Sequence, residues 1–451
     1  MSPSFDRSQL EFVRDGSVGL DFGTTNSAVA RVVDSRPVLA SFVTPQGPTQ
    51  TFPSILYFQR HRGSAGTRLT SSAGPVAIDR YLNAEEKGRL IQSLKAFLAD
   101  RRFDGTAIFS KRYTLEDLIA LIVHHMLVDA RQALGGIPGR VVVGRPVHFS
   151  TGADESDDQF ALARLRTAVT QCGFEDIVFE YEPVAAAYSY ERGLEHDELI
   201  LIGDFGGGTS DFSLLHVGPS VRRRGRTSRD ILGSDGVAIA GDAFDRQIIR
   251  KLVAPRLGLG SEYLSPPNKF LPMPNWPYDR LERWHHVSFM NNAANIDKLE
   301  RLLQHASVPE RIQALIHLIQ GELGYQLHEA VRRTKFDLSV QTNTQFRFRC
   351  DPISMNITVT RSEFDTWIEA ELAAIAACVD RLLNTTGVSA NDIDHVFLTG
   401  GSAFVPAVRE IFVRRFGAAK ITGGAELTSV AMGLALRAEE QWPARKGASR
   451  V

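Results

Sequence analysis

An eight-residue pattern occurs twice in this chain of 451 residues. The first copy is LDFGTTNS, from Leu20 to Ser27, and the second is GDFGGGTS, from Gly203 to Ser210. Each copy follows an apolar run, contains Asp-Phe-Gly, continues with small or hydroxyl-bearing residues and leads into a second β-rich run. The two aspartates are 183 residues apart, which is the size of a domain. The repeat therefore predicts two related lobes rather than a short-period solenoid.

Each copy has the pattern of a β-hairpin whose tip carries little side-chain bulk. Glycine accepts positive φ, so the backbone N–H groups of Gly206, Gly207 and Gly208 can approach an anion closely. Thr24, Thr25 and Thr209 add hydroxyl groups. The chain has no GxxxxGK[ST] motif, which excludes the strand-to-helix P-loop as the phosphate site.

The aspartate of each copy stands at the end of a predicted strand. Asp21 and Asp204 could therefore hold Mg²⁺ through its waters, because this ion keeps much of its hydration shell beside carboxylates and phosphates. Two facing tips predict a nucleoside triphosphate bound between the lobes. The alternative is a pair of glycine-rich hairpins without a ligand, and the presence of two copies weighs against it.

Between and after the two copies, short β-rich runs alternate with longer helical patterns, which predicts an α/β fold with βαβ units. We expect strands at 17–22, 28–33, 140–143, 199–204, 212–217 and 395–399, and helices at 115–134, 157–172, 243–257, 309–335 and 361–384. We predict a first lobe at 1–198, a second lobe at 199–440 with a helical and proline-rich insertion at about 255–335, and a flexible tail at 441–451. Within the insertion, the proline-rich stretch 264–284 is expected to be irregular.

Composition limits the partners of the chain. Lys and Arg number 51 against 52 Asp and Glu, and this balance argues against a nucleic-acid partner, which usually requires a basic excess. There are three cysteines without a CxxC pair, which argues against a disulfide framework and a thiolate zinc site. We find no signal-peptide pattern and no apolar run long enough to span a membrane, so we expect a cytoplasmic location.

Two further segments are candidate binding regions: one is rich in glycine and the other is rich in arginine. Leu398 to Ser402 follows the strand pattern 395–399 and precedes Pro406 and a helical stretch, a setting that suits close approach to a ribose, an adenine or a phosphate. The run Arg222-Arg223-Arg224, with Arg226 and Arg229, predicts a basic loop that either contacts a phosphate or an acidic partner or is simply solvated.

Taken together, these segments resemble the ATPase part of the heat shock protein 70 (DnaK) family, within the actin/hexokinase/heat-shock ATPase superfamily, and more closely its short YegD-like members. The matching segments, in chain order, are 19–30, 141–150 with 181–188, 202–214, 241–245 and 395–406. The resemblance implies an α/β fold of two ribonuclease-H-like (actin-like ATPase) lobes, each subdivided, with ATP and Mg²⁺ in the cleft between them.

The resemblance also implies a role for individual residues. Catalytic roles fall on Lys95, Glu182, Asp211 and Thr209. Water-mediated Mg²⁺ contacts fall on Asp21 and Asp204. Nucleotide contacts fall on Gly23, Thr24, Thr25, Asn26, Gly206, Gly207, Gly208, Thr209, Gly241, Asp242, Lys335, Ser339, Gly400, Gly401, Ser402 and Phe404. For Lys95, an ordinary solvated helix lysine remains the alternative.

The sequence departs from the family pattern at the adenosine site. Arg332 stands where the family has a glutamate, and Phe404 stands where it commonly has an arginine. In the segment from Ala240 to Asp245, the aspartate Asp242 stands where the family pattern has a glutamate, so a carboxylate is kept. The segment 426–433 lacks the family's Asn-Pro-Asp-Glu pattern. Phosphate chemistry is therefore expected to be intact and nucleoside recognition altered.

These residues predict an ATP-binding, weakly ATP-hydrolysing, chaperone-like protein whose lobe closure acts on an unknown protein partner or co-chaperone. We expect no membrane or nucleic-acid partner and no client-binding domain in this chain. Two alternatives stay open: a small-molecule kinase of the same superfamily, with Asp211 as its base, and an actin-like filament-forming protein.

Overall fold

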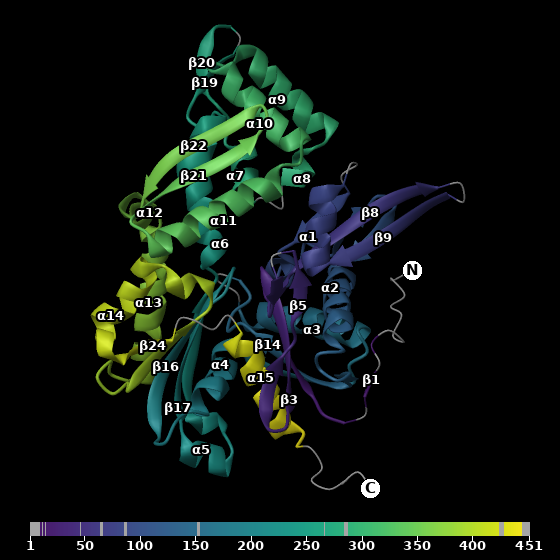
Figure 1. Cartoon of the computed structure of the whole chain (residues 1–451). Coiled ribbons are helices and arrows are strands. Elements are labelled where there is room, and N and C mark those ends of the chain that lie inside the picture. The colour runs from purple at the N-terminus through teal and green to yellow at the C-terminus, as the bar shows by residue number, and fades with distance from the viewer. Residues whose placement is uncertain are drawn as a thin grey trace. The chain divides into compact units, whose positions relative to one another are not determined.

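The computed structural model describes residues 10, 12–13, 15–45, 47–63, 66–84, 88–150, 154–265, 267–283, 287–423 and 428–443 (Figure 1). The chain divides into two compact units. Unit 1 consists of Met1–Ala240, Ala374–Phe404 and Val408–Val451, and unit 2 consists of Gly241–Ala373 and Val405–Ala407. Both copies of the repeated pattern belong to unit 1. The lobe boundary at residue 198 stays a prediction, and most of the predicted tail lies outside the described residues.

The first main sheet of unit 1 contains the first copy of the repeat. Its strands follow the order β15-β14-β2-β3-β4, with β7 also paired to β3. Their bounds are β2 (Val18–Asp21), β3 (Asn26–Val33), β4 (Arg36–Leu39), β7 (Phe52–Pro53), β14 (Arg140–Arg145) and β15 (Asp176–Tyr181). Strands β2 and β3 form the expected antiparallel hairpin, whereas β2, β14 and β15 are parallel. Helix α3 (Glu155–Gln171) makes the crossover that the parallel pair β14 and β15 requires.

The second main sheet contains the second copy and is built on the same plan. Its order is β18-β17-β16-β23-β24. Its strands are β16 (Glu198–Phe205), β17 (Ser210–Val217), β18 (Ile231–Val237), β23 (His395–Thr399) and β24 (Ile421–Gly423). An antiparallel hairpin, β16 and β17, again lies beside a parallel strand, β23. The prediction that the two copies fold alike is confirmed.

Two helices pack closely against each other in unit 1, and the first of them contacts β16 and β17 of the second sheet more extensively than β14 and β15 of the first. Helix α4 (Glu182–Glu191) follows β15, and α15 (Ser429–Gln441) packs against α4, β2 and β3, as Figure 1 shows. The contact depends on glycine: a Cβ at Gly433 would lie 1.7 Å from the carbonyl oxygen of Ala185, and one at Gly19 would lie 2.2 Å from the nitrogen of Ala435. Elements far apart in the sequence thus share one core.

Helix α2 (Leu115–Ala130) packs against α3 and is buried along most of its length. Thr114 and Asp117 form a capping box at its start, since each side chain accepts a hydrogen bond from the other residue's backbone. The other elements are β1 (Phe12–Val13), β5 (Phe42–Thr44), β6 (Gly47–Thr49), β8 (Ile55–Gly63), β9 (Gly66–Ala73), α1 (Gly74–Asn83), β10 (Arg89–Gln92), β11 (Gly105–Ile108), β12 (Lys111–Thr114), β13 (Ile137–Pro138) and α5 (Pro219–Arg224).

Unit 2 is mostly helical. Helix α6 (Gly241–Ile248) continues through a π-helical turn (Ile249–Val253) and a 3-10 turn (Ala254–Leu257), as the helix predicted at 243–257 requires. The later elements are β19 (Glu262–Ser265), β20 (Lys269–Pro272), α7 (Trp276–Leu281), α8 (Val287–Met290), α9 (Ala293–His305), α10 (Pro309–Gln320), α11 (Gly324–Val340), β21 (Asn343–Cys350), β22 (Ile353–Thr360), α12 (Arg361–Trp367) and α13 (Glu369–Thr386), which continues into unit 1.

Three expectations for this region are wrong. The stretch predicted as one helix at 309–335 is two helices, because the chain turns after Gly321 and Glu322 adopts a positive φ of 52°. The helix predicted at 361–384 is likewise divided, at Ile368. The described part of the proline-rich stretch forms the β19–β20 hairpin and α7 rather than irregular chain, since Pro277 fits the first turn of a helix. Trp284 lies outside the described residues.

Among the helices of the described part of the chain, none is long and apolar enough to cross a membrane.

Candidate functional site

The tips of the two repeated hairpins contact each other within unit 1. The first tip joins β2 to β3, and the second joins β16 to β17, where the Gly206 nitrogen donates to the Thr209 oxygen over 2.9 Å. A Cβ added to Gly208 would lie 3.1 Å from Oγ1 of Thr24. The absence of a side chain at Gly208 therefore lets the two tips approach.

One serine fixes the shape of the first tip. The buried Ser54 hydroxyl donates to the Gly23 oxygen over 2.8 Å and lies 2.9 Å from the Ser27 hydroxyl. Its backbone N–H donates to the Thr25 oxygen over 2.9 Å. We did not predict Ser54, because it lies about thirty residues beyond its partners and belongs to no recognised motif.

A buried ion pair lies in the same unit. The Lys95 Nζ atom is 2.5 Å from Oε1 of Glu182, and both side chains are buried. Lys95 belongs to a 3-10 helix (Leu94–Phe97), and Glu182 is the first residue of α4. Burial disfavours the charged lysine, but the carboxylates of Glu182 and Asp21 outweigh it and raise the pKa of Lys95. The alternative of a solvated helix lysine is therefore wrong.

Three aspartates share the electrostatic environment of this pair. Asp21 ends β2, and Asp204 and Asp211 face each other on β16 and β17. Burial and then the charge of Glu182 raise the pKa of Asp21 to about 7 and that of Asp211 to about 7. The same two causes raise the pKa of Asp204 well above its ordinary value. The group holds more negative charge than Lys95 alone can balance.

Asp211 is held by one oxygen. Its Oδ1 accepts a hydrogen bond from the Val147 nitrogen over 2.7 Å, and a Cβ at Gly236 would lie 2.6 Å from the same oxygen. The Thr209 hydroxyl lowers the pKa of Asp211, yet Oδ2 is buried without a partner at hydrogen-bonding geometry in the described part of the chain. One oxygen of this carboxylate is thus available to a ligand or a water.

The donor set fits a hydrated cation better than a directly bound one. Among the described residues, no three His, Cys, Asp or Glu side chains converge closely enough to hold a metal ion. Ionisation of the aspartates is nevertheless disfavoured, because Lys95 does not compensate for their burial and for the charge of Glu182. A hydrated Mg²⁺ beside Asp21 and Asp204 would favour their ionised forms, because its waters reach carboxylates that do not converge.

The third glycine-rich segment lies against the second tip. Gly400 has a φ of 85°, and a Cβ on it would lie 2.2 Å from the Phe205 oxygen. The following 3-10 helix (Gly401–Phe404) contains the buried Ser402 and ends at Phe404, whose exposed fraction is 45%. Helix α14 (Pro406–Phe416) begins where proline predicts it. The aromatic face of Phe404 is therefore available for stacking.

The remaining predicted residues lie together within unit 2. The Lys335 Nζ atom is 2.8 Å from Oδ1 of Asp245 and donates to the Gly241 oxygen over 3.0 Å, so it joins α11 to α6. Ser339 donates to the Lys335 oxygen over 3.0 Å, and burial raises the pKa of Asp242. Asp245 was part of a recognised segment but was not predicted as a partner of Lys335.

The departure at Arg332 has a local partner. Its Nη1 atom donates to Oε1 of Glu329 over 2.9 Å, one turn earlier in α11. A carboxylate therefore remains on this helix, at a position three residues before the one that the family pattern uses.

A protein-family model described as Hsp70 protein matches residues 93–255 and 313–446, about two thirds of the chain. The matched ranges include Lys95, Glu182, the second hairpin tip and the segment around Gly400. The first tip precedes them.

Proposed function

The chain belongs to the Hsp70 family, whose members are ATP-binding proteins of the chaperone type with the actin-like ATPase fold, and from this we propose that it binds Mg·ATP at the two hairpin tips and hydrolyses it slowly. The observation that carries the proposal is the buried Lys95–Glu182 pair surrounded by Asp21, Asp204 and Asp211. Buried carboxylates with raised pKa values and an unneutralised charge are typical of functional sites.

Each group would have a distinct task. The backbone N–H groups and hydroxyls of the tips bind phosphate oxygens, and Ser54 keeps the first tip in shape. Lys95, which stays charged, stabilises the negative charge of the transferring phosphoryl group. A bound magnesium ion would supply charge neutralisation between phosphate oxygens. Asp21 and Asp204 would hold its waters.

Asp211 is the candidate for orienting the attacking water. Its buried Oδ2 can accept a hydrogen bond, and its pKa of about 7 suits proton exchange near neutral pH. Glu182 holds Lys95 in place and begins α4, so movement of this carboxylate would be transmitted to a helix. We propose that this link makes the nucleotide state a switch acting on a protein partner.

Phe404 bears on nucleoside selectivity. Since it stands where the family commonly has an arginine and is exposed, we propose that its ring stacks on the base. Stacking is tolerant of base identity because every base has an aromatic face. Preference for adenine over guanine should therefore be weaker than for an enzyme that recognises the base by hydrogen bonds.

We propose a cytoplasmic location as well, which the three free cysteines support.

Calorimetry tests the binding proposal. We expect Mg·ATP to bind with one site per chain, and the paired variant Asp21→Asn/Asp204→Asn to weaken binding more in the presence of Mg²⁺ than in EDTA. The matched control is Asp297→Asn, an exposed aspartate of α9. Absence of binding heat with Mg·ATP, or equal weakening with and without Mg²⁺, would exclude the proposed site.

One observation favours a second function, phosphoryl transfer to a small molecule. The free oxygen of Asp211 could accept a proton from a substrate hydroxyl as readily as it orients water. Measuring ATP turnover with and without a panel of metabolites separates the two functions. Strong stimulation by one compound, with its phosphorylated product detected, would identify a kinase.

A further inference from the structure

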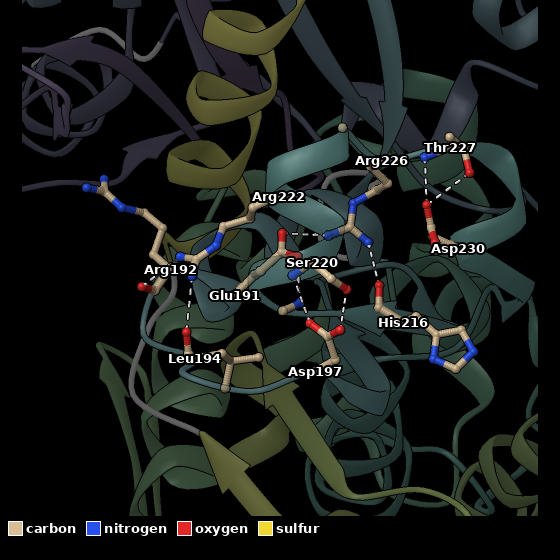
Figure 2. A network of polar contacts seen from close by, with 12 residues as sticks. Glu191, Arg192, Leu194, Asp197, His216, Ser220, Arg222, Arg226, Thr227 and Asp230 are labelled. Atoms are coloured by element: carbon tan, nitrogen blue, oxygen red, sulfur yellow. Dashed lines mark hydrogen bonds and ion pairs between the residues drawn. The ribbon is translucent and has the colours of Figure 1, made fainter.

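A set of exposed arginines lies on helix α5 and in two short segments close to it in the chain or joined to it by hydrogen bonds. The α5 basic surface consists of Arg192, Arg222, Arg223 and Arg229, and all of these residues are exposed. Figure 2 shows Arg192 and Arg222 together with the polar groups that hold this region. The function proposed above uses none of these arginines.

Two neighbouring arginines form ion pairs within the protein. Arg226 forms an ion pair of 2.7 Å with Glu191, and both side chains are buried. Arg224 binds both carboxylate oxygens of Asp230. The other oxygen of Glu191 accepts a hydrogen bond from the Gly218 nitrogen over 2.7 Å, directly before α5 begins. These pairs fix the backbone that carries the exposed arginines, and their charges are neutralised.

The exposed arginines keep their charge. Arg222 donates through Nη1 to the Arg192 oxygen and through Nη2 to the Leu194 oxygen, each over 3.1 Å. Arg192 donates to the Ser35 oxygen over 3.0 Å. Backbone carbonyls thus order the guanidinium groups of Arg222 and Arg192 without neutralising them. Within the described residues, no carboxylate lies at ion-pair distance from any of the four arginines of this surface. The hydrogen bonds of Ser220, and then the charge of Arg223, lower the pKa of the exposed Asp197, so Arg223 interacts with this carboxylate at longer range.

We infer that the α5 basic surface docks an acidic peptide segment of a partner protein. Guanidinium groups bind carboxylates through paired, charge-assisted hydrogen bonds, and ordered arginines lose less entropy on binding than free ones. The exposed carboxylate of Asp197, which accepts hydrogen bonds from Ser220 of α5, borders the surface. It would repel the continuous charge of a nucleic acid but leave room for a short acidic segment.

Helix α4 connects this surface to the candidate site. Its first residue, Glu182, binds Lys95, and its last residue, Glu191, binds Arg226 and the Gly218 nitrogen. An effect of docking on ATP turnover rests on the proposed function, but docking itself does not. The two can therefore be tested separately.

Fluorescence anisotropy with a labelled poly-glutamate peptide and the nucleotide-free full chain tests docking. We expect saturable binding that weakens as ionic strength rises. The variant Arg222→Glu/Arg223→Glu should bind at least about tenfold more weakly. The matched control is Arg347→Glu/Arg349→Glu, which reverses two exposed arginines on β21. Arg223→Glu alone should show a smaller loss in the same direction, which covers the case that the double variant does not fold.

Four results would overturn the inference: no binding of poly-glutamate, equal loss in the β21 control, equal binding of poly-lysine, or tighter binding of an oligonucleotide than of poly-glutamate. ATP turnover with and without the peptide then reports on coupling. If the protein hydrolyses no ATP but still binds the peptide through Arg222 and Arg223, docking stands and the proposed function fails.

Discussion

Lys95 retains its charge although it is buried, because two carboxylates compensate for the loss of solvation. Replacement by methionine removes the charge and keeps an apolar side chain of similar length. We expect Lys95→Met to lower ATP turnover by about 10²–10³-fold while Mg·ATP still binds. This is the usual effect of removing one preorganised group that stabilises charge in the transition state. Single-turnover hydrolysis and calorimetry measure the two effects separately.

The same variant leaves Glu182 buried without its partner, a change that costs about 3–5 kcal/mol of unfolding free energy. Adding Glu182→Gln should restore stability but not turnover. Lys298→Met, at an exposed lysine of α9, is the control. Unchanged turnover in Lys95→Met would remove Lys95 from the site.

Ser54 acts on the first tip through hydrogen bonds alone. Ser54→Ala leaves the Gly23 oxygen without its donor, so we expect a loss of about 1–3 kcal/mol in unfolding free energy and weaker Mg·ATP binding. Ser72→Ala is a matched control, since that hydroxyl is buried without a hydrogen-bond partner among the described residues. Similar ATP affinities for the two variants would show that Ser54 is not a positioning residue.

His125 makes stability depend on pH. Burial, with the charges of His124 and Arg80, lowers the pKa of His125 to about 4. Between its ordinary pKa of about 6.5 and this value, the unfolded chain binds a proton that the folded chain does not, so stability falls as pH falls. At pH 4 the loss should reach about 3 kcal/mol.

Urea unfolding of the wild type and of His125→Gln across this pH range measures the effect. The variant cannot titrate there and should show the shallower decline. His216→Gln, at an exposed histidine, should behave as the wild type does. Parallel curves for wild type and His125→Gln would contradict the assignment.

Among individual site residues, the sequence predicted those that stand at the end of a strand or in a glycine-rich hairpin tip. Asp21 and Asp204 are of this kind: Asp21 is the last residue of β2, and Asp204 is the last but one of β16. Lys95 was identified only through family resemblance, because nothing in its own neighbourhood indicates that Glu182, 87 residues later, is its partner. Ser54 was missed for the same reason: its partners are distant in sequence and the residue itself is common.

Helices α4 and α15 pack so closely that a glycine is required between them. A Gly→Ala change within a helix ordinarily stabilises it by about 1 kcal/mol. At Gly433 the added Cβ would lie 1.7 Å from the Ala185 oxygen, so the sign should reverse. We expect Gly433→Ala to destabilise the fold by about 1–3 kcal/mol.

Thermal unfolding monitored by circular dichroism checks this prediction. The control is Gly139→Ala, because a Cβ at that glycine meets no atom within 4 Å. A stabilised or unchanged Gly433→Ala protein would mean that the two helices can separate at no cost.

Among the elements, β8, β15, β21 and β22 were not predicted, but the six predicted strands all exist, and β23 has the predicted bounds. Their apolar runs are short and flanked by turn residues, so local pattern suffices. Helix breaks were missed because apolar periodicity continues through Gly321 and Ile368. The positive φ of Glu322 could not be read from this pattern, because a residue other than glycine rarely adopts it.

Ligand binding should stabilise the whole molecule. A ligand that binds only the folded chain adds about 2.7 kcal/mol of stability at a concentration one hundred times its Kd. We expect Mg·ATP to raise the melting temperature, and ATP in EDTA to raise it less, because no cation then favours ionised Asp21 and Asp204 or offsets the charge of the phosphates. Differential scanning fluorimetry measures both shifts. Equal shifts with and without Mg²⁺ would argue against a cation between these aspartates and the nucleotide.

The packing of α15 on β2 and β3 has a consequence for synthesis of the protein. The ribosome makes β2 and β3 early, but the helix that covers them is made last among the described elements. Until then, the first sheet exposes apolar surface that the finished molecule buries. Contacts between segments that are far apart in the sequence can form only late, and this slows folding and leaves nascent chains prone to aggregation. A translation stall before residue 429 should therefore yield a chain that proteases degrade faster than the completed one.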